Sequence, residues 1–145
     1  MSITDPYNLN RFKTAQEPIF ETALVELHSG RKQTHWMWFV FPQLRGLGRS
    51  QIAVFYGISS IEEARAYLAD PVLGERLRLA VAAVLSVENR SGHAIFGSPD
   101  DMKFRSSMTL FSAAAEGEGG SLFRSALNRY FAGEPDERTL ALLEG

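Results

Sequence analysis

The most regular pattern in the chain is an apolar stripe between Asp70 and Leu85. Apolar residues recur there every three or four positions, which places them on one face of an α-helix. Asp70-Pro71 comes just before the stripe, in the order typical of a helix start, because aspartate caps free N–H groups and proline fits the first turn. The pattern predicts a helix over residues 71–85.

Similar helix starts recur along the chain. Asp5-Pro6, Ser98-Pro99 and the capping box Ser60–Glu63 each predict that a helix begins there. In the capping box, the serine and the glutamate are expected to satisfy each other's free N–H groups. Pro18 predicts a break after the first helix, because proline disrupts the preceding turn. Further starts are expected at Pro18, Ser50, Ser121 and Asp136, with stops at Gly30, Gly57 and Gly133.

The segment His35–Gln43, HWMWFVFPQ, holds both tryptophans of the chain. Its periodicity alone fits either a strand or a buried helix. Both neighbouring regions have helical patterns and no partner strand is evident, so a strand here would leave its backbone groups unpaired. We therefore expect a short buried helix that ends at Pro42, followed by a loop over residues 44–49.

Repeated caps without an alternating strand pattern predict an all-α fold. The 145 residues contain no internal repeat and no evident linker. We expect residues 1–145 to form a single compact domain of about seven to eight short helices, arranged as an orthogonal bundle or a solenoid-like array.

Composition narrows the classes of function. The chain is 45% apolar and 22% charged, as in ordinary soluble proteins, and its net charge of −2 gives no overall attraction to nucleic acid or to an anionic membrane. It contains no cysteine, and its three histidines lack metal-ligand spacing. We expect a soluble, cytoplasmic protein with no metal or cofactor and no nucleic-acid partner. The sequence leaves its oligomeric state open.

The first candidate site lies on the helix that should begin at Pro99. Lys103 and Ser107 share one face of this helix, with Ser106 beside them. If buried, they need partners, which a pocket for an anionic or carbonyl-rich ligand would supply. We predict Lys103 and Asp101 as catalytic residues, with Lys103 on a phosphate and Asp101 as acid or base.

The alternative for this face is structural. Asp100 and Lys103 would form a surface ion pair, and the serines would bond to the preceding helical turn.

The second candidate site is the rim of the aromatic segment. Indole rings can stack on a flat base, and a glutamine can hydrogen-bond to an amide or a nucleobase edge. In the alternative, the tryptophans fill the core and His35 satisfies a backbone group. The predicted ligand-binding residues are Lys32, His35, Trp36, Trp38, Gln43, Ser106 and Ser107.

Three segments carry a family resemblance: residues 35–48, residues 56–68 and residues 96–111. With them, the chain strongly resembles the small bacterial proteins grouped as domain of unknown function family 1810. The similarity covers nearly the whole sequence. The resemblance implies a single all-α domain and brings no established activity.

A more distant resemblance bears on the ligand. Trp36, Trp38 and Lys103-Phe104 are similar to elements of the NADAR proteins, which are linked to NAD and ADP-ribose chemistry, including cleavage of N-glycosidic ADP-ribose bonds. This implies a nucleotide or ADP-ribose ligand between the aromatic helix and the Asp101–Ser107 helix. If the protein is an enzyme, an N-glycosidic hydrolase is implied. The alternative is a non-enzymatic protein–protein interaction module with the aromatic run as its core.

Overall fold

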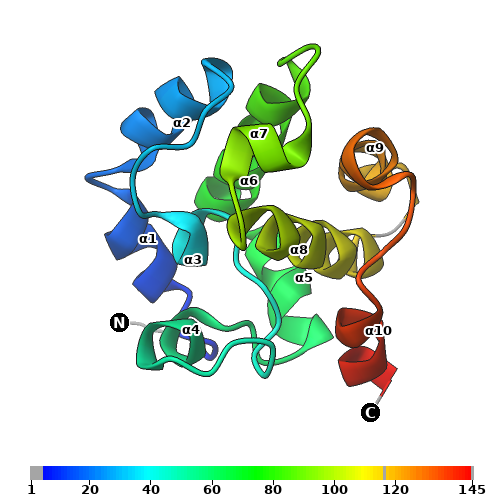
Figure 1. The fold of residues 1–145 in the computed structure, drawn as a ribbon. Coiled ribbons are helices and arrows are strands. Elements are labelled where there is room, and N and C mark those ends of the chain that lie inside the picture. The colour runs from blue at the N-terminus through cyan, green and yellow to red at the C-terminus, as the bar shows by residue number, and fades with distance from the viewer. Residues whose placement is uncertain (1–4, 116, 145) are drawn as a thin grey trace.

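The computed structural model describes residues 5–115 and 117–144, and the secondary-structure elements of this part of the chain are all helices (Figure 1). The all-α fold class is thus confirmed. Ten α-helices are found in this part of the chain, and seven of them have seven residues or more. The helices are α1 (Asn10–Gln16), α2 (Phe20–His28), α3 (Met37–Val40), α4 (Gln51–Tyr56), α5 (Ile61–Ala69), α6 (Pro71–Leu85), α7 (Gly92–Phe96), α8 (Asp100–Ala114), α9 (Ser121–Phe131) and α10 (Glu137–Glu144), with a 3-10 turn η1 (Gly117–Gly120) before α9.

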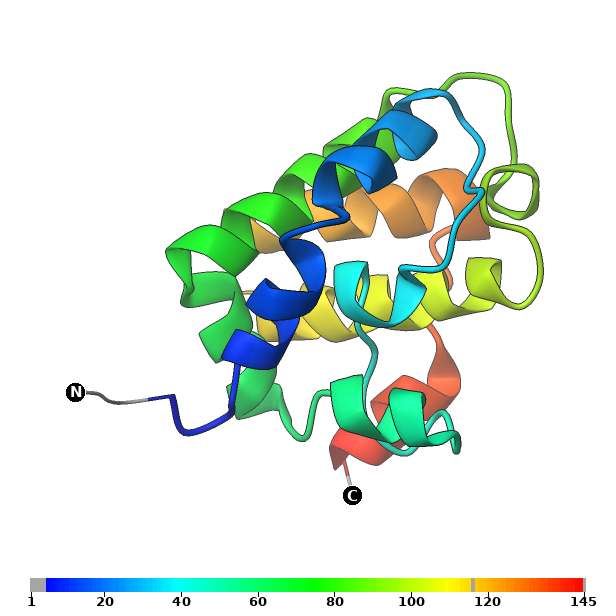
Figure 2. The same cartoon turned by 90° about the vertical axis from the view of Figure 1, so that its left-hand side faces the viewer.

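The two longest helices, α6 and α8, organise the packing. Helix α8 packs against α5, α7, α9 and α10, whereas α6 packs against α2, α5 and α9 (Figure 2). Helices far apart in the sequence, such as α2 and α6, therefore lie side by side. This arrangement is that of a bundle. No described helix combines the length and the apolar character that a membrane crossing requires.

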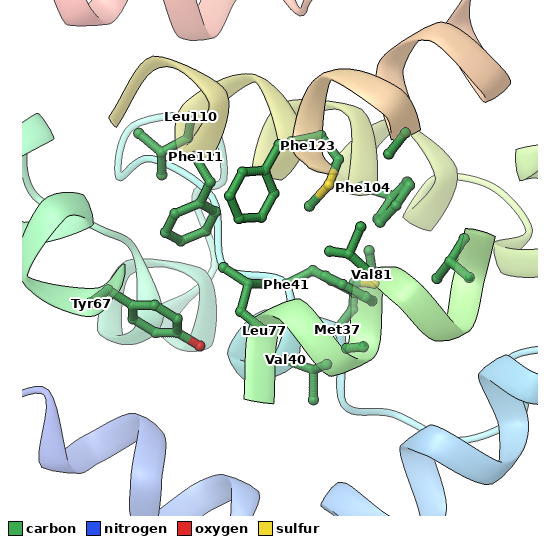
Figure 3. Close-up of a cluster of buried hydrophobic side chains, with 14 of the residues drawn as sticks. Met37, Val40, Phe41, Tyr67, Leu77, Val81, Phe104, Leu110, Phe111 and Phe123 are labelled. Carbon is green, nitrogen blue, oxygen red and sulfur yellow. The ribbon is translucent and has the colours of Figure 1, made fainter. Parts of the chain in front are cut away.

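The core is rich in aromatic side chains (Figure 3). Phe41 lies at its centre, with its ring edge-on to Phe104 at a centroid distance of 5.0 Å and to Phe96 at 5.9 Å. The ring of Phe111 packs against that of Tyr67 at a centroid distance of 5.3 Å. Burial of each large apolar side chain contributes about 1.5–3 kcal/mol, so these rings hold the aromatic segment firmly against α8.

Most predicted caps are present. The side chain of Asp70 accepts hydrogen bonds from the backbone N–H groups of Val72 and Leu73, at 2.9 and 3.0 Å. Ser60 accepts a bond from Glu63 N at 3.1 Å. The return half of this capping box differs from the prediction, because the Glu63 carboxylate bonds to the N–H and hydroxyl of the residue before Ser60.

Two helix starts also differ from the prediction. Helix α1 begins at Asn10, because the Asp5 carboxylate accepts bonds from Leu9 N and Asn10 N and so closes a turn ahead of the helix. Helix α8 begins without a side-chain cap from Ser98. The short helix α7 was not predicted, since its five residues are too few to show an apolar stripe.

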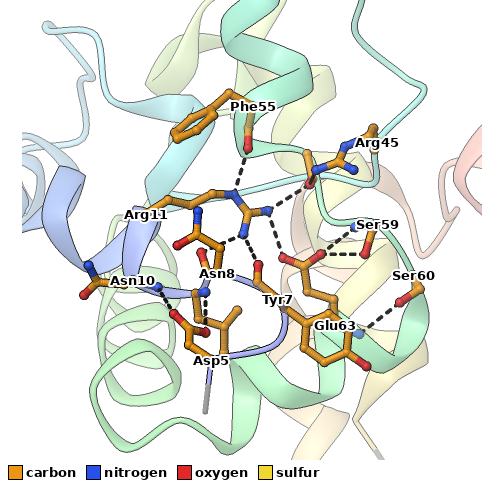
Figure 4. A network of polar contacts seen from close by, with 12 residues as sticks. Asp5, Tyr7, Asn8, Asn10, Arg11, Arg45, Phe55, Ser59, Ser60 and Glu63 are labelled. Carbon is orange, nitrogen blue, oxygen red and sulfur yellow. Dashed lines mark hydrogen bonds and ion pairs between the residues drawn. The ribbon is translucent and has the colours of Figure 1, made fainter. Parts of the chain in front are cut away.

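One buried ion pair joins the first helix to the middle of the chain (Figure 4). Arg11 Nη2 lies 2.8 Å from Glu63 Oε2, and both side chains are almost fully buried. The same guanidinium donates to the carbonyl oxygens of Phe55 and Gly57, at 2.7 and 3.0 Å. Arg11 thereby connects α1 to α5 and to the end of α4.

Candidate functional site

A narrow cleft brings together three residues that the sequence predicted for ligand binding or catalysis. Trp38 comes from α3, Gln43 follows Pro42, and Lys103 comes from α8. The hollow has a volume of about 250 Å³ including its open mouth, but its cavity proper is about 10 Å³, close to the space of one water molecule. The other lining residues are Met37, Phe41, Ala53, Tyr56 and Gly57.

Lys103 is the cation of this cleft. Its Nζ lies 5.1 Å from the centre of the Trp38 ring, within the range of a cation–π interaction. Its nearest carboxylate oxygen is Asp100 Oδ1 at 3.7 Å, which is too long for a good hydrogen bond. The side chain keeps 27% of its surface exposed. The ammonium is therefore loosely held, and an incoming anion can reach it.

Lys32 occupies a tighter position on the other side of Asp100. Its Nζ lies 2.9 Å from Asp100 Oδ2, donates to Thr34 O at 2.7 Å and sits 5.1 Å from the centre of the Trp36 ring. Only 7% of the side chain is exposed. These partners account for the charge of Lys32 within the fold, and the side chain does not line the cleft.

Trp36 is a core residue. Its side chain is completely buried, and its indole N–H donates to Glu26 Oε1 at 2.9 Å. The same carboxylate accepts bonds from Gln33 N, Thr34 N and the Thr34 hydroxyl. Burial raises the pKa of Glu26, but these hydrogen bonds outweigh burial and hold that pKa below its ordinary value. The alternative given for Trp36, a place in the core, matches this geometry.

Asp101 lies on the other side of α8 from Lys103. Two residues correspond to about 200° of rotation along a helix, so the two side chains point apart. Asp101 Oδ2 lies 3.5 Å from Nδ1 of His93, and its Oδ1 accepts a bond from Met102 N. The two residues predicted as catalytic do not share one site. The carboxylate beside Lys103 is that of Asp100.

The remaining predicted residues lie outside the cleft lining. The Ser106 hydroxyl donates to Met102 O at 3.1 Å, as the structural alternative predicts for a serine within a helix. Ser107, one turn beyond Lys103, is fully buried, and its hydroxyl has no hydrogen-bond partner among the described residues. His35 is exposed ahead of α3.

Comparison with known proteins places this arrangement in a family. The model of the family described as "Protein of unknown function (DUF1810)" matches residues 6–143. The chain belongs to the DUF1810 family. It is also 52% identical to the conserved hypothetical protein Rv1873 from Mycobacterium tuberculosis, whose crystal structure superposes with a TM-score of 0.94 over 97% of this chain and 99% of that chain. No curated protein matches the sequence. This DUF1810 member therefore has the same fold as Rv1873, whereas neither the family description nor the description of that structure gives an activity.

Two residues of the cleft lining in this DUF1810 protein were not predicted as part of the site. Ala53 and Gly57, at the inner side and end of α4, line the cleft together with Tyr56 and Lys103. The Tyr56 ring packs on Phe39 at a centroid distance of 5.4 Å. In the sequence these residues belong to a short apolar run after a serine cap, a pattern that indicates a helix and says nothing about which side meets a ligand.

The cleft offers three kinds of binding group: the ammonium of Lys103, the indole ring of Trp38 and the amide of Gln43. The described residues contain no group of three side chains suited to hold a metal ion.

Proposed function

We propose that the cleft of this DUF1810 protein binds a small phosphate-bearing ligand of the nucleotide or ADP-ribose type. The observation that carries the proposal is the convergence of Lys103 from α8 with Trp38 and Gln43 from the aromatic segment. A lysine ammonium pairs with phosphate, an indole ring stacks on a base, and a glutamine amide bonds to a base edge. These three groups match the phosphate and the base of such a ligand.

The ligand class has support from the NADAR resemblance. Of the four residues that carry it, Trp38 and Lys103 line the cleft, whereas Trp36 and Phe104 are buried in the core. The two residues of the resemblance that a ligand could contact, Trp38 and Lys103, are therefore both in the cleft lining.

We propose binding without assigning a reaction. Hydrolysis of an N-glycosidic bond would need an acid or base close to the bound sugar. Asp101 faces His93 on the far side of α8, and Asp100 is already paired with Lys32. Neither carboxylate lines the cleft.

Isothermal titration calorimetry of the wild-type protein with ADP-ribose, ADP and inorganic phosphate tests the proposal. We expect ADP-ribose or ADP to bind, and Lys103→Ala to weaken that binding by at least about tenfold, or about 1.4 kcal/mol. Arg138→Ala removes an exposed cation from α10, away from the cleft, and should leave the affinity unchanged. Absence of binding to the wild type, or equal binding by Lys103→Ala, would refute it.

A second candidate, the non-enzymatic interaction module, is favoured by one observation. Helix α4 presents Phe55 to the surface with 52% of the side chain exposed, beside the exposed Ile52 and Val54. Exposed aromatic and aliphatic clusters are typical of interfaces. Sedimentation velocity over a range of concentrations tests association with a second copy of the chain. That association should be lost in Phe55→Asp, and a monomer at every concentration would argue against it.

A further inference from the structure

We propose that residues 45–57, with α4 at their centre, form a hinged lid over the cleft and control ligand entry. This inference rests on the proposed function, because it concerns access to the same site. The cleft as it stands has room for about one water molecule, far less than a nucleotide needs. One of its walls must therefore move, and four features of the structure identify the wall formed by α4.

The first feature is the exposure of α4. Among the described helices, it is the one without a buried residue. Ile52, Val54 and Phe55 are 40%, 45% and 52% exposed. Displacing a helix costs mainly the apolar contacts that it loses, and segments with little burial open locally at low free energy. The opposite wall, α8, is anchored by Phe104, Met108 and Phe111, all fully buried.

The second feature is a pinned base. Leu44 and Ile58 form an isolated parallel bridge, in which Arg45 N donates to Ile58 O at 2.7 Å and Ile58 N donates to Gln43 O at 2.9 Å. The packing at the base is close, since a Cβ at Gly57 would lie 2.8 Å from Cβ of Arg45. The two ends of the segment are thus fixed together while its middle lies at the edge of the molecule (Figure 2). Compact surface loops with joined ends have this form.

The third feature is that α4 is held together internally. The Ser50 hydroxyl accepts a bond from Ala53 N at 3.2 Å at one end of the helix. At the other end, Arg45 Nε donates to Val54 O at 3.1 Å, so both stabilising side chains belong to the same segment. The segment can therefore swing as a unit without unwinding.

The fourth feature is a hydrogen-bond donor, the Arg11 guanidinium, that keeps its position when α4 moves away. Arg11 Nε donates to Phe55 O at 2.7 Å, and this bond would break as α4 moves away (Figure 4). The guanidinium would stay in place, because it is paired with Glu63 and bonded to Tyr7 O and Asn8 O, all of which lie outside the moving segment. The lid thus has a fixed point to which it can return.

Thiol labelling of the ligand-free protein tests the lid, and the chain contains no native cysteine to interfere. Met37 lines the cleft and is 2% exposed, whereas Met108 is 0% exposed on α8 and does not line it. We expect Met37→Cys to react with a small thiol reagent at least about tenfold faster than Met108→Cys. The rate for Met37→Cys should hardly depend on low urea, because lid opening exposes little surface, while the Met108→Cys rate should follow global unfolding.

Oxidation of the unaltered chain by hydrogen peroxide, followed by peptide mass spectrometry, provides a second readout in case a cysteine variant folds poorly. Met37 should convert to its sulfoxide at least about tenfold faster than Met108, because only Met37 lines the cleft. Equal labelling of the two cysteines with the same urea dependence, or equal oxidation rates of the two methionines, would overturn the lid. An opening lid without binding of ADP-ribose, ADP or phosphate would refute the proposed function alone. Ligand binding with Met37→Cys as inert as Met108→Cys would refute the lid alone.

Discussion

The two tryptophans lie two positions apart in the sequence and have almost the same charged surroundings. A lysine Nζ lies 5.1 Å from the ring centre of each, Lys32 at Trp36 and Lys103 at Trp38. Both lysines face the same carboxylate, that of Asp100. Residue types alone therefore give the two indoles the same role.

Burial separates them. Trp36 precedes α3 with a non-helical backbone, at φ −137° and ψ 7°, whereas Trp38 lies inside the helix, and the two side chains reach different surroundings. Trp36 enters the core and finds a buried acceptor in Glu26, whereas Trp38 stays half-buried at the mouth of the cleft. A tryptophan that binds a ligand must therefore keep one face of its ring exposed. An indole whose N–H is already bonded to a buried acceptor, as in Trp36, has a structural role.

Truncation of the indoles should show the largest difference. We expect Trp36→Ala to lower the free energy of unfolding by about 3–5 kcal/mol, because it leaves a core cavity and removes a bond to a buried carboxylate. Trp38→Ala should cost about 1 kcal/mol or less, since the ring is partly exposed. Urea unfolding followed by circular dichroism measures both. Similar losses in the two variants would remove the distinction.

Neutralising the partner of Trp36 should have the next largest effect. At neutral pH, Glu26→Gln should cost about 1.5–3 kcal/mol, because four donors lose a charged acceptor. The folded-state pKa of Glu26 lies below its ordinary 4.5, so its contribution is fully present above that pH and is lost as the pH falls through the folded value. The variant should lose stability less steeply than the wild type as the pH falls below 4.5.

Asp70 is the internal control for this acid titration. Burial raises the pKa of Asp70, but its bonds to Lys13 and to the start of α6 hold that pKa below the ordinary value. Some acid sensitivity should therefore remain in Glu26→Gln. Identical pH profiles for the variant and the wild type would contradict the role assigned to Glu26.

The helices could be predicted because their signals are local. Asp70-Pro71, Ser60 and Ser50 act within three residues of themselves, and an apolar stripe needs only one helix to be visible. Helical rotation likewise predicts that Lys103 and Ser107 share one face of α8. The aromatic segment was assigned correctly because no second strand was available to pair with it.

The site was predicted less completely because its decisive contacts are distant in sequence. Trp36 meets Glu26 ten residues away, and Arg11 meets Glu63 at a separation of 52 residues. No period or motif encodes such pairs. The sequence could predict polar residues of the cleft, such as Gln43, but it could not predict which candidate residues would be buried in the core.

The lysine that belongs to each indole offers a smaller contrast. Lys32→Met should cost about 1–2 kcal/mol, between the values for exposed and buried pairs, because its partner Asp100 is itself 21% exposed. Lys103→Met should change stability by about 0.5 kcal/mol or less, since its ion pair is long and its side chain partly exposed. Thermal unfolding at matched ionic strength compares them. A larger loss for Lys103→Met would mean that its charge is structural.

The smallest expected effect concerns the serines of α8. Ser107 is fully buried with no hydrogen-bond partner among the described residues, so Ser107→Ala should leave stability unchanged or raise it by up to about 1 kcal/mol. Ser106 is bonded to Met102 O of its own helix, and Ser106→Ala should cost no more than about 0.5 kcal/mol. Urea unfolding of both variants, measured together, resolves their order. A loss above about 1 kcal/mol for Ser107→Ala would show that the buried hydroxyl has a hydrogen-bond partner, one helical turn beyond Lys103.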